Sequence, residues 1–598
     1  MIEKIKKITL LVSKKEREKF LLKLRNVGVL HIKETKEPIH SDITLIDEKI
    51  SKINKLIEII KPYKIKANSS KEVLTEENIL EKCKTIELLE KEKGEKRLFI
   101  KNLEQQKEWF NIWTDFNPKD IIFLKNKGIY IQFFTITKQE FEEIKDKNNI
   151  FLIKKNKNNV NIIVVSLKEK IELQFNEIII PLESRHYINK KIDNLKKEIE
   201  NIENIFKTTA SKLTEIQKIK QKIEQKREFI TVKYTMQEET EFCYMQGFCP
   251  KKKINNLISI LKLNGVGYII EDPNENDDPP TLITKPKYLK IIDPVFKFMN
   301  TIPGYKEFDI SFSFLMFFGL FFAMIIGDAG YGVLFFLISL IMHLKLKNKI
   351  MKKEPFFLIY FLSINTIIWG CITGTWFGSE YLSQQPILKN FIIKSIGSFS
   401  IGNENILIFI CFIIGAIQLT IAHLLRALRF INSLKCLSEI GWIFILWGMF
   451  FTAGKFVIGR DLPIITMWLF VIGVNFVLIF SNLQKGIIKG ILSTLTDLPL
   501  SIISSFSDIV SYLRLFAVGY SSVVIASSFN DMALSNGING FITGIIAAFI
   551  LFIGHILNIS LGFMGVIVHG IRLNMLEYSG HLGMQWSGKE YKAFCEKE

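Results

Sequence analysis

One arginine stands in the middle of a long apolar stretch in the last fifth of the chain. It is Arg514, within DIVSYLRLFAVGYSS (508–522). A charge at the centre of a bilayer costs at least about 2.5–3.5 kcal/mol, and an arginine cannot shed its proton to avoid that cost. Ser511 lies one turn before it on the same helical stripe, and Asp508 and Tyr512 are close in sequence. Small polar neighbours of this kind let a second helix approach or admit water.

The next apolar stretch carries polar residues of its own, which are His555, Asn558, His569, Arg572 and Glu577. His569 and Arg572 are three residues apart and therefore share a helix face. Two interpretations are open. These residues and Arg514 line an ion path, or Arg514 only forms a buried ion pair with Asp508 or Glu577 while Arg572 snorkels to the interface. Taken alone, the two histidines would more often be satisfied core residues than proton carriers.

Other short motifs do not indicate a catalytic centre. Asp328, in the turn GDAGYG (327–332), is most simply a helix cap at the interface, with a channel-lining role as the alternative. GMQWSGKE (583–590) resembles a phosphate loop but follows an apolar helix, with no strand before it. Cys243 and Cys249 have no histidine nearby. We therefore predict no catalytic site, no cofactor and no metal.

Composition divides the chain in two. The 598 residues carry 78 basic and 60 acidic side chains, a net charge of +18. Of these, 58 basic and 45 acidic residues lie in residues 1–300, which leaves 20 and 15 for the rest. A charge-rich half followed by an apolar half predicts a soluble domain attached to a membrane domain. The N-terminus has no apolar segment typical of a signal peptide, and no aromatic-interleaved basic patch indicates a nucleic-acid partner.

The first half, residues 1–280, has the pattern of an α/β domain with coiled-coil arms. Two β-α-β patterns, in 1–35 and 236–272, predict one near lobe built from both ends of the domain. Helical arms are expected at 41–112 and 183–232, where apolar residues recur at alternating steps of three and four (Ile192, Leu195, Ile199, Ile202, Phe206, Leu213, Ile216, Ile223). Residues 119–180, including IIFL, GIYIQFFTI and IELQF, predict a far β-rich lobe, giving a dumbbell.

The second half predicts an α-helical polytopic membrane domain at 309–578, after a linker (281–308) and before a tail (579–598). Apolar segments long enough for a core of about 30 Å number eight: 309–327, 330–344, 355–377, 405–425, 437–458, 463–481, 497–528 and 538–577. With a cytoplasmic N-terminal half, inner loops hold thirteen basic residues and outer loops four. This predicts both termini in the cytoplasm of a cell-membrane protein. The last two segments are too long for an upright crossing and must tilt or kink.

The residues of the last two spans carry a family resemblance. SYLRLFAVG (511–519) and HGIRLNMLE (569–577) resemble the final membrane helices of subunit I, or subunit a, of V-type rotary ATPases. GDAGYG, WGCITGTWFG (369–378), GHILN (554–558) and, more loosely, GFCP (247–250) resemble the prokaryotic branch. The resemblance extends over the whole chain.

This resemblance implies a membrane stator with two offset ion half-channels against a rotating c/K-type proteolipid ring. Arg514 would face the ring carboxylate and Arg572 would match the family's second arginine, while His569, Glu577, His555 and Asn558 would line the path or position the arginines. The implied partners are the ring, peripheral stalk subunits of the E/G type, and the V1/A1 catalytic head with its central stalk, where ATP chemistry would reside. The family translocates H⁺ or Na⁺, and the sequence leaves that choice open.

Two departures and two rival functions remain. Some relatives carry an acid seven residues before the position of His569, where this chain has Gly562, and the tail SGHLGMQWSGKEYKAF (579–594) departs from the usual ending. One rival is an independent secondary transporter, which would favour paired broken helices in repeated halves. The other is a membrane-anchored scaffold, which leaves Arg514 and the two motifs unexplained.

Overall fold

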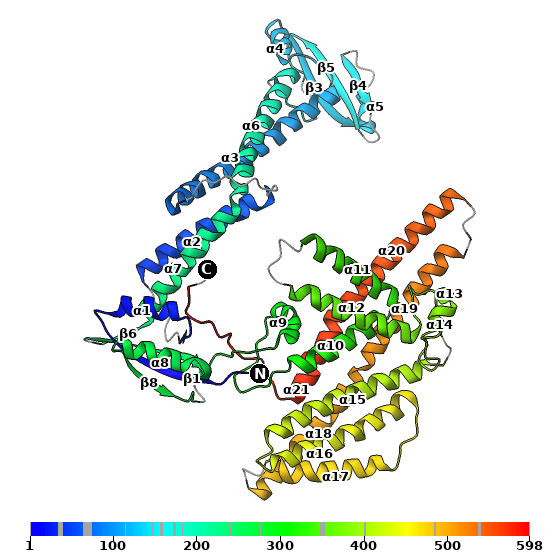
Figure 1. Cartoon of the computed structure of the whole chain (residues 1–598). Helices are drawn as coiled ribbons and strands as arrows, with labels where there is room; N and C mark the ends of the chain where they lie inside the picture. The colour runs from blue at the N-terminus through cyan, green and yellow to red at the C-terminus, as the bar shows by residue number, and fades with distance from the viewer. Residues whose placement is uncertain are drawn as a thin grey trace. The chain divides into compact units, whose positions relative to one another are not determined.

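The structure is a computed structural model of the whole chain (Figure 1). It describes all residues except 1, 34–39, 64–74, 114, 145–148, 156–158, 172–174, 182, 240, 275–276, 347–352, 400–401, 483–485, 536, 538–539 and 597–598. The described chain separates into two compact units. The first comprises residues 1–10, 27–33 and 246–594, and the second comprises residues 11–26, 34–245 and 595–598.

The second unit contains the helical arms. α2 (Ser41–Ile60) packs on α7 (Leu213–Thr235), and α3 (Glu76–Trp113) packs on α6 (Arg185–Ser211). The predicted apolar stripe is buried at Ile192, Ile202, Phe206, Leu213, Ile216 and Ile223. It meets apolar residues of α2 and α3, so the coiled-coil pairing is formed within the chain. Lys93 of α3 is buried there and forms an ion pair with Glu203 at 3.0 Å, and this contact lowers the pKa of Glu203.

The same unit carries a small lobe whose sheet has the order β3–β5–β4, all antiparallel. The strands are β3 (Ile129–Thr137), β4 (Ile150–Lys155) and β5 (Asn159–Leu167), with α5 (Lys138–Ile144) between the first two. One part of the sequence prediction is wrong. The segment IIFL lies in helix α4 (Pro118–Asn126), because Pro118 at its first turn and the Asn117 side chain, which accepts from the Lys119 amide, start a helix there. Part of IELQF lies outside the described residues.

Elements from the two ends of the first 280 residues form one further sheet, of order β2–β7–β1–β8, with β6 on β7. The strands are β1 (Ile5–Ser13), β2 (His31–Ile32), β6 (Gln237–Glu238), β7 (Phe242–Pro250) and β8 (Gly267–Glu271), with helices α1 (Arg17–Val27) and α8 (Ile254–Leu263). In the first unit, Lys7 and Lys33 both bind Asp277, at 2.9 Å each, and they hold the pKa of that carboxyl well below its usual range.

Apolar helices make up most of the first unit. Six described helices are long and apolar enough to cross a membrane, at 329–346, 354–373, 404–429, 435–458, 488–534 and 541–581. They correspond to α11 (Ala329–Leu346), α12 (Glu354–Thr373), α15 (Glu404–Arg429), α16 (Lys435–Ala453) with its π-helical extension, α18 (Ile487–Ser511) with α19 (Leu513–Leu534), and α20 (Phe541–Gly565) with its continuation to His581. Two of the eight predicted spans, at α10 (Ser311–Ile326) and α17 (Ile465–Phe480), are shorter apolar helices. The expected count of eight is therefore not established by helix length.

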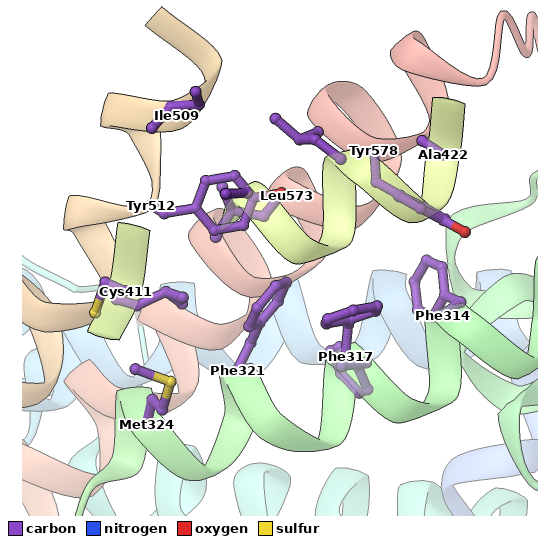
Figure 2. Close-up of a cluster of buried hydrophobic side chains, with 14 of the residues drawn as sticks. Phe314, Phe317, Phe321, Met324, Cys411, Ala422, Ile509, Tyr512, Leu573 and Tyr578 are labelled. Atoms are coloured by element: carbon purple, nitrogen blue, oxygen red, sulfur yellow. The ribbon is translucent and has the colours of Figure 1, made fainter. Parts of the chain in front are cut away.

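Helix α10 is the centre of the packing in this unit. Its residues Phe314, Phe317, Phe321 and Met324 project as a row toward Tyr512, Leu573 and Tyr578 from the last two long helices, as Figure 2 shows. The rings of Phe321 and Tyr512 lie edge to face with centroids 6.0 Å apart. This cluster holds the helices that carry the two arginines against one common support.

Close backbone approach fixes α19 against α10. A Cβ atom added at Gly519 would lie well inside van der Waals contact of the Met324 carbonyl oxygen, which is backbone and cannot move aside cheaply. Gly519→Ala is expected to destabilise the membrane unit by about 1–3 kcal/mol, because overpacking forces backbone shifts. Thermal unfolding of the purified protein in detergent would measure the loss.

Gly454→Ala is the matched control. A Cβ at Gly454 would meet nothing within 4 Å, so its unfolding temperature should be equal to that of the unmodified chain or slightly higher. Equal unfolding temperatures for the two variants would contradict the close approach at Gly519.

Candidate functional site

The two longest helices both depart from α-helical geometry where they carry arginine. α18 ends at Ser511 and α19 begins at Leu513, so the break falls at Tyr512, two residues before Arg514. The last long helix contains π-helical turns at Val566–Gly570 and Leu573–Tyr578, on either side of Arg572. Such π-helical turns are rare and frequently mark functional sites. They change which residues face α19, and this brings Glu577 to Arg514.

Arg514 is held by one side chain and one carbonyl. Its Nη2 donates to Glu577 Oε1 at 2.7 Å, and its Nε donates to the Ser511 carbonyl oxygen at 3.0 Å. Of the two ion-pair partners considered from sequence, the structure thus selects Glu577 and not Asp508. Ser511 contributes its carbonyl. The Glu577 side chain is 4% exposed and that of Arg514 is 25% exposed.

A second arginine shares the same carboxylate. Arg572 Nε lies 3.7 Å from Glu577 Oε1, and its side chain is 52% exposed. The other oxygen, Glu577 Oε2, is buried and has no hydrogen-bond partner among the described residues. Two cations therefore compete for one buried anion. Leaving this buried carboxylate wholly unpaired would cost several kcal/mol.

Tyr512 is fixed beside Arg514 by a chain of buried hydrogen bonds. Its hydroxyl donates to Gln418 Oε1 at 2.9 Å, and Gln418 Nε2 donates to Asn574 Oδ1 at 2.9 Å. Gln418 of α15 and Asn574 of the last helix are both fully buried. This chain joins three elements around Arg514. Gln418 and Asn574 were missed from sequence, because single amides in apolar helices carry no spacing signal.

His555 and Asn558 lie together in a separate polar cluster. The Tyr331 hydroxyl lies 2.7 Å from His555 Nδ1 and accepts from Asn558 Nδ2 at 3.1 Å. Ser522 Oγ donates to Asn558 Oδ1 at 3.0 Å, and Asn558 Nδ2 also reaches the Ser522 carbonyl at 2.9 Å. These contacts provide hydrogen-bond partners for both polar atoms of the Asn558 amide, whose side chain belongs to a residue that is 1% exposed. The cluster therefore joins α11, α19 and α20.

His569 lies in a different setting. Its Nδ1 is buried without a hydrogen-bond partner among the described residues. His569 lines a cavity of about 280 Å³ between α19 and the last helix, together with Ser521, Asn558 and Gly562. Gly562 has no side chain at the position where some relatives carry an acid. Part of the cavity beside His569 therefore stays empty.

Asp328 has the geometry of a structural cap. Its carboxylate, 2% exposed, accepts from the amides of Gly330 at 2.8 Å and Tyr331 at 3.3 Å, at the start of α11. It also accepts from Phe377 at 2.9 Å and Gly378 at 2.8 Å, at the end of WGCITGTWFG. This one carboxylate accounts for both motifs, which favours the capping interpretation over a channel-lining one.

Two arginines that share one buried carboxylate lie on two over-long helices of a polytopic helical unit, and a separate unit carries charged helical arms. No protein-family model matches the chain. It is 34% identical to V-type ATP synthase subunit I of Borreliella burgdorferi, over 99% of both chains. It is 26% identical to V-type ATP synthase subunit I 1 of Treponema pallidum, over the full length of both. It is 27% identical to A-type ATP synthase subunit I of Archaeoglobus fulgidus, over 58% of both.

The chain belongs to the subunit I family of V-type and A-type ATP synthases. This confirms the family inferred from SYLRLFAVG and HGIRLNMLE. It makes the chain a multi-pass membrane subunit of a rotary ATPase.

The Arg514–Glu577 pair yields a stability prediction. Glu577→Ala should destabilise the membrane unit by about 3–5 kcal/mol, because it leaves the Arg514 charge with no close carboxylate. Arg514→Leu combined with Glu577→Ala should recover most of that loss, since the remaining charge at the site is the half-exposed Arg572. Unfolding in detergent by the single and double variants measures the coupling. Losses that simply add in the double variant would show that the two side chains do not interact.

Proposed function

We propose that this chain is the membrane stator subunit that forms ion half-channels against a rotating c/K-type ring, with Arg514 as the residue that meets each ring carboxylate. The observation that carries the proposal is the partly exposed Arg514, held by a carboxylate that Arg572 also reaches. A scaffold without transport has no need for a charge in this position. An independent transporter would need a repeated pair of broken helices.

The physics of the pair supports this role. A cation about 4 Å from a carboxylate is worth roughly 4 kcal/mol at an effective dielectric near 20, which corresponds to about three pKa units of the ring carboxyl. An arriving ring carboxylate would therefore lose its bound ion and stay ionised beside Arg514. Arg572 would keep Glu577 paired during this exchange. The fixed charge of Arg514 would also repel cations and so prevent leakage between the half-channels.

The remaining site residues have separate roles in this proposal. Tyr512, Ser511 and Glu577 position Arg514. His569 and the adjacent cavity belong to an ion path, and His555 and Asn558 hold α20 on α19 beside that path. In this proposal both termini lie in the cytoplasm, as the loop charges favour, and the eight apolar segments lie in the cell membrane.

The arms of the second unit would connect to the rest of the enzyme. The small lobe exposes large apolar side chains on α4 and β4, namely Ile122, Phe123, Phe151 and Leu152. Exposed apolar groups gathered on one small lobe suit a protein partner. By family membership that partner is a peripheral stalk subunit of the E/G type, which would hold the V1/A1 head and its catalytic sites against rotation.

Arg514→Gln tests the central claim. The variant complex should assemble and hydrolyse ATP at least in part, while ATP-driven ion uptake into inverted membrane vesicles is abolished, because a neutral amide cannot displace the ion from the ring carboxylate. Arg572→Ala serves as the comparison and should be milder. Uptake near that of the unmodified enzyme in Arg514→Gln would refute the assignment.

Deleting residues 119–180 tests the stator role of the arm. The catalytic head should detach from the membranes, while the membrane half stays inserted. Phe123→Asp combined with Phe151→Asp should weaken attachment without removing the lobe, since it places charges on the proposed docking surface. A head that stays attached at the normal level in the deletion would exclude this role.

A further inference from the structure

A second group of ionisable side chains lies buried in the membrane unit. Glu439 Oε2 of α16 lies 2.9 Å from His423 Nδ1 of α15. His423 Nε2 lies 2.9 Å from Nδ1 of His581, in the short helix α21 (Ser579–His581). His581 Nε2 lies 3.0 Å from Asp508 Oδ2 of α18. The four residues thus form an unbroken chain, here termed the relay, across four helices.

The relay is buried over most of its length and is more open at its Asp508 end. The side chains of His423 and Glu439 are 4% and 8% exposed, and that of His581 is 10% exposed. At one end Asp508 is 26% exposed. At the other end Arg426, whose side chain is 38% exposed, pairs with Glu439 at 3.0 Å. The relay therefore has one partly exposed end, Asp508, and one buried end, Glu439, which the more exposed Arg426 connects to the surface.

Counting hydrogens shows that the relay holds one excess proton. Each of its three contacts needs one hydrogen, and two neutral imidazoles supply only two, while ionised carboxylates supply none. One further proton must therefore be shared along the chain. The two carboxylates, this proton and the Arg426 charge then sum to zero, so the group can be buried without a net charge.

The geometry allows that proton to cross the whole chain. One hydrogen moves from Glu439 Oε2 to His423 Nδ1, a second from His423 Nε2 to His581 Nδ1, and a third from His581 Nε2 to Asp508 Oδ2. No atom is gained or lost, and one proton has passed from Glu439 to Asp508. The two imidazoles then reset by side-chain motion before the next passage. Imidazole is suited to this step because each ring has two nitrogens that exchange roles.

One end of the relay lies on the same two helices as the arginine site. Asp508 precedes the Ser511–Arg514 turn on the α18–α19 helix, and His581 lies four residues after Glu577 on the last helix. The same two helices thus carry the Arg514–Glu577 pair and, about one to two turns further on, the Asp508–His581 pair. The other end reaches Arg426, in the last turn of α15, next to the loop that the charge bias places on the cytoplasmic side.

We propose that Glu439, His423, His581 and Asp508 conduct protons between the cytoplasmic boundary and the Arg514 site, and that the translocated ion is therefore H⁺. This inference rests on the proposed function of the chain. The alternative ion, Na⁺, prefers several oxygen ligands. It cannot pass through a contact between two imidazole nitrogens, whereas a proton can.

His423→Gln and His581→Gln, each in the complete ATPase complex, test the relay. ATP-driven acidification of inverted vesicles should fall by about 10²-fold or more, the usual loss when a positioned proton-transfer group is removed. Assembly and ATP hydrolysis in detergent should be retained, since glutamine keeps donor and acceptor groups but cannot pass a proton. Added imidazole should restore part of the acidification, a response that a purely structural role would not produce.

His343→Gln is the matched control. His343 of α11 lies 3.1 Å from the Tyr360 hydroxyl and stacks on Phe356, outside the relay, so acidification should be unchanged. If a histidine variant of the relay fails to assemble, Asp508→Asn at the more open end is the second test. Its amide still accepts a hydrogen bond but cannot receive the proton, and the same loss is expected.

Three outcomes would overturn the relay. They are unchanged acidification in His423→Gln and His581→Gln, unchanged acidification in Asp508→Asn, or ATP-driven ²²Na⁺ uptake that persists when a protonophore collapses the pH gradient. These differ from failure of the proposed function. If Arg514→Gln abolishes uptake while the relay variants do not change it, only the relay is excluded.

Discussion

The ion pair between Arg514 and the buried Glu577 carboxylate is the constraint on which the membrane unit depends. A permanent cation inside an apolar bundle is tolerated only if an anion lies within ion-pair distance, and here that distance is 2.7 Å. The pair requires the last two long helices to lie in register, so that Arg514 of one is level with Glu577 of the other. The break at Tyr512 and the π-helical turns around Arg572 allow this meeting where two regular helices would present other residues.

The surrounding structure maintains this alignment. The aromatic row of α10 supports both long helices, and Gly519 lets α19 approach the backbone of α10. Tyr512, Gln418 and Asn574 connect α15 to the same place through hydrogen bonds that are fully buried. Asp328 fixes the turn before α11 with four amide contacts. Each contact is modest, but together they hold the Arg514–Glu577 pair in place.

Prediction from sequence succeeded where a local pattern carries the signal. Hydrophobic length marked the long spans, alternating steps of three and four marked the arms, and the neighbours of Arg514 marked the family. Prediction failed where a short helix-start signal outweighed the apolar pattern. The segment IIFL was assigned to a strand because it is apolar, yet Asn117 and Pro118 start helix α4. The helices α10 and α17 are 16 residues each, so apolar content alone overstated their length.

The sequence by itself determined which charges enter the membrane unit. Arg514, Arg572 and Glu577 lie within long apolar segments, and such segments must be buried in the membrane or in the protein. Only the tertiary structure decided how they pair. Glu577 rather than Asp508 binds Arg514, and Asp508 contacts His581 instead. The partners are 63 residues apart in the first pair and 73 in the second, so helix packing and irregular turns decide which residues meet. His423 and Glu439 have the same origin. Neither belongs to a motif that the sequence shows, and they become part of a polar chain only because four helices bring the side chains within hydrogen-bond distance.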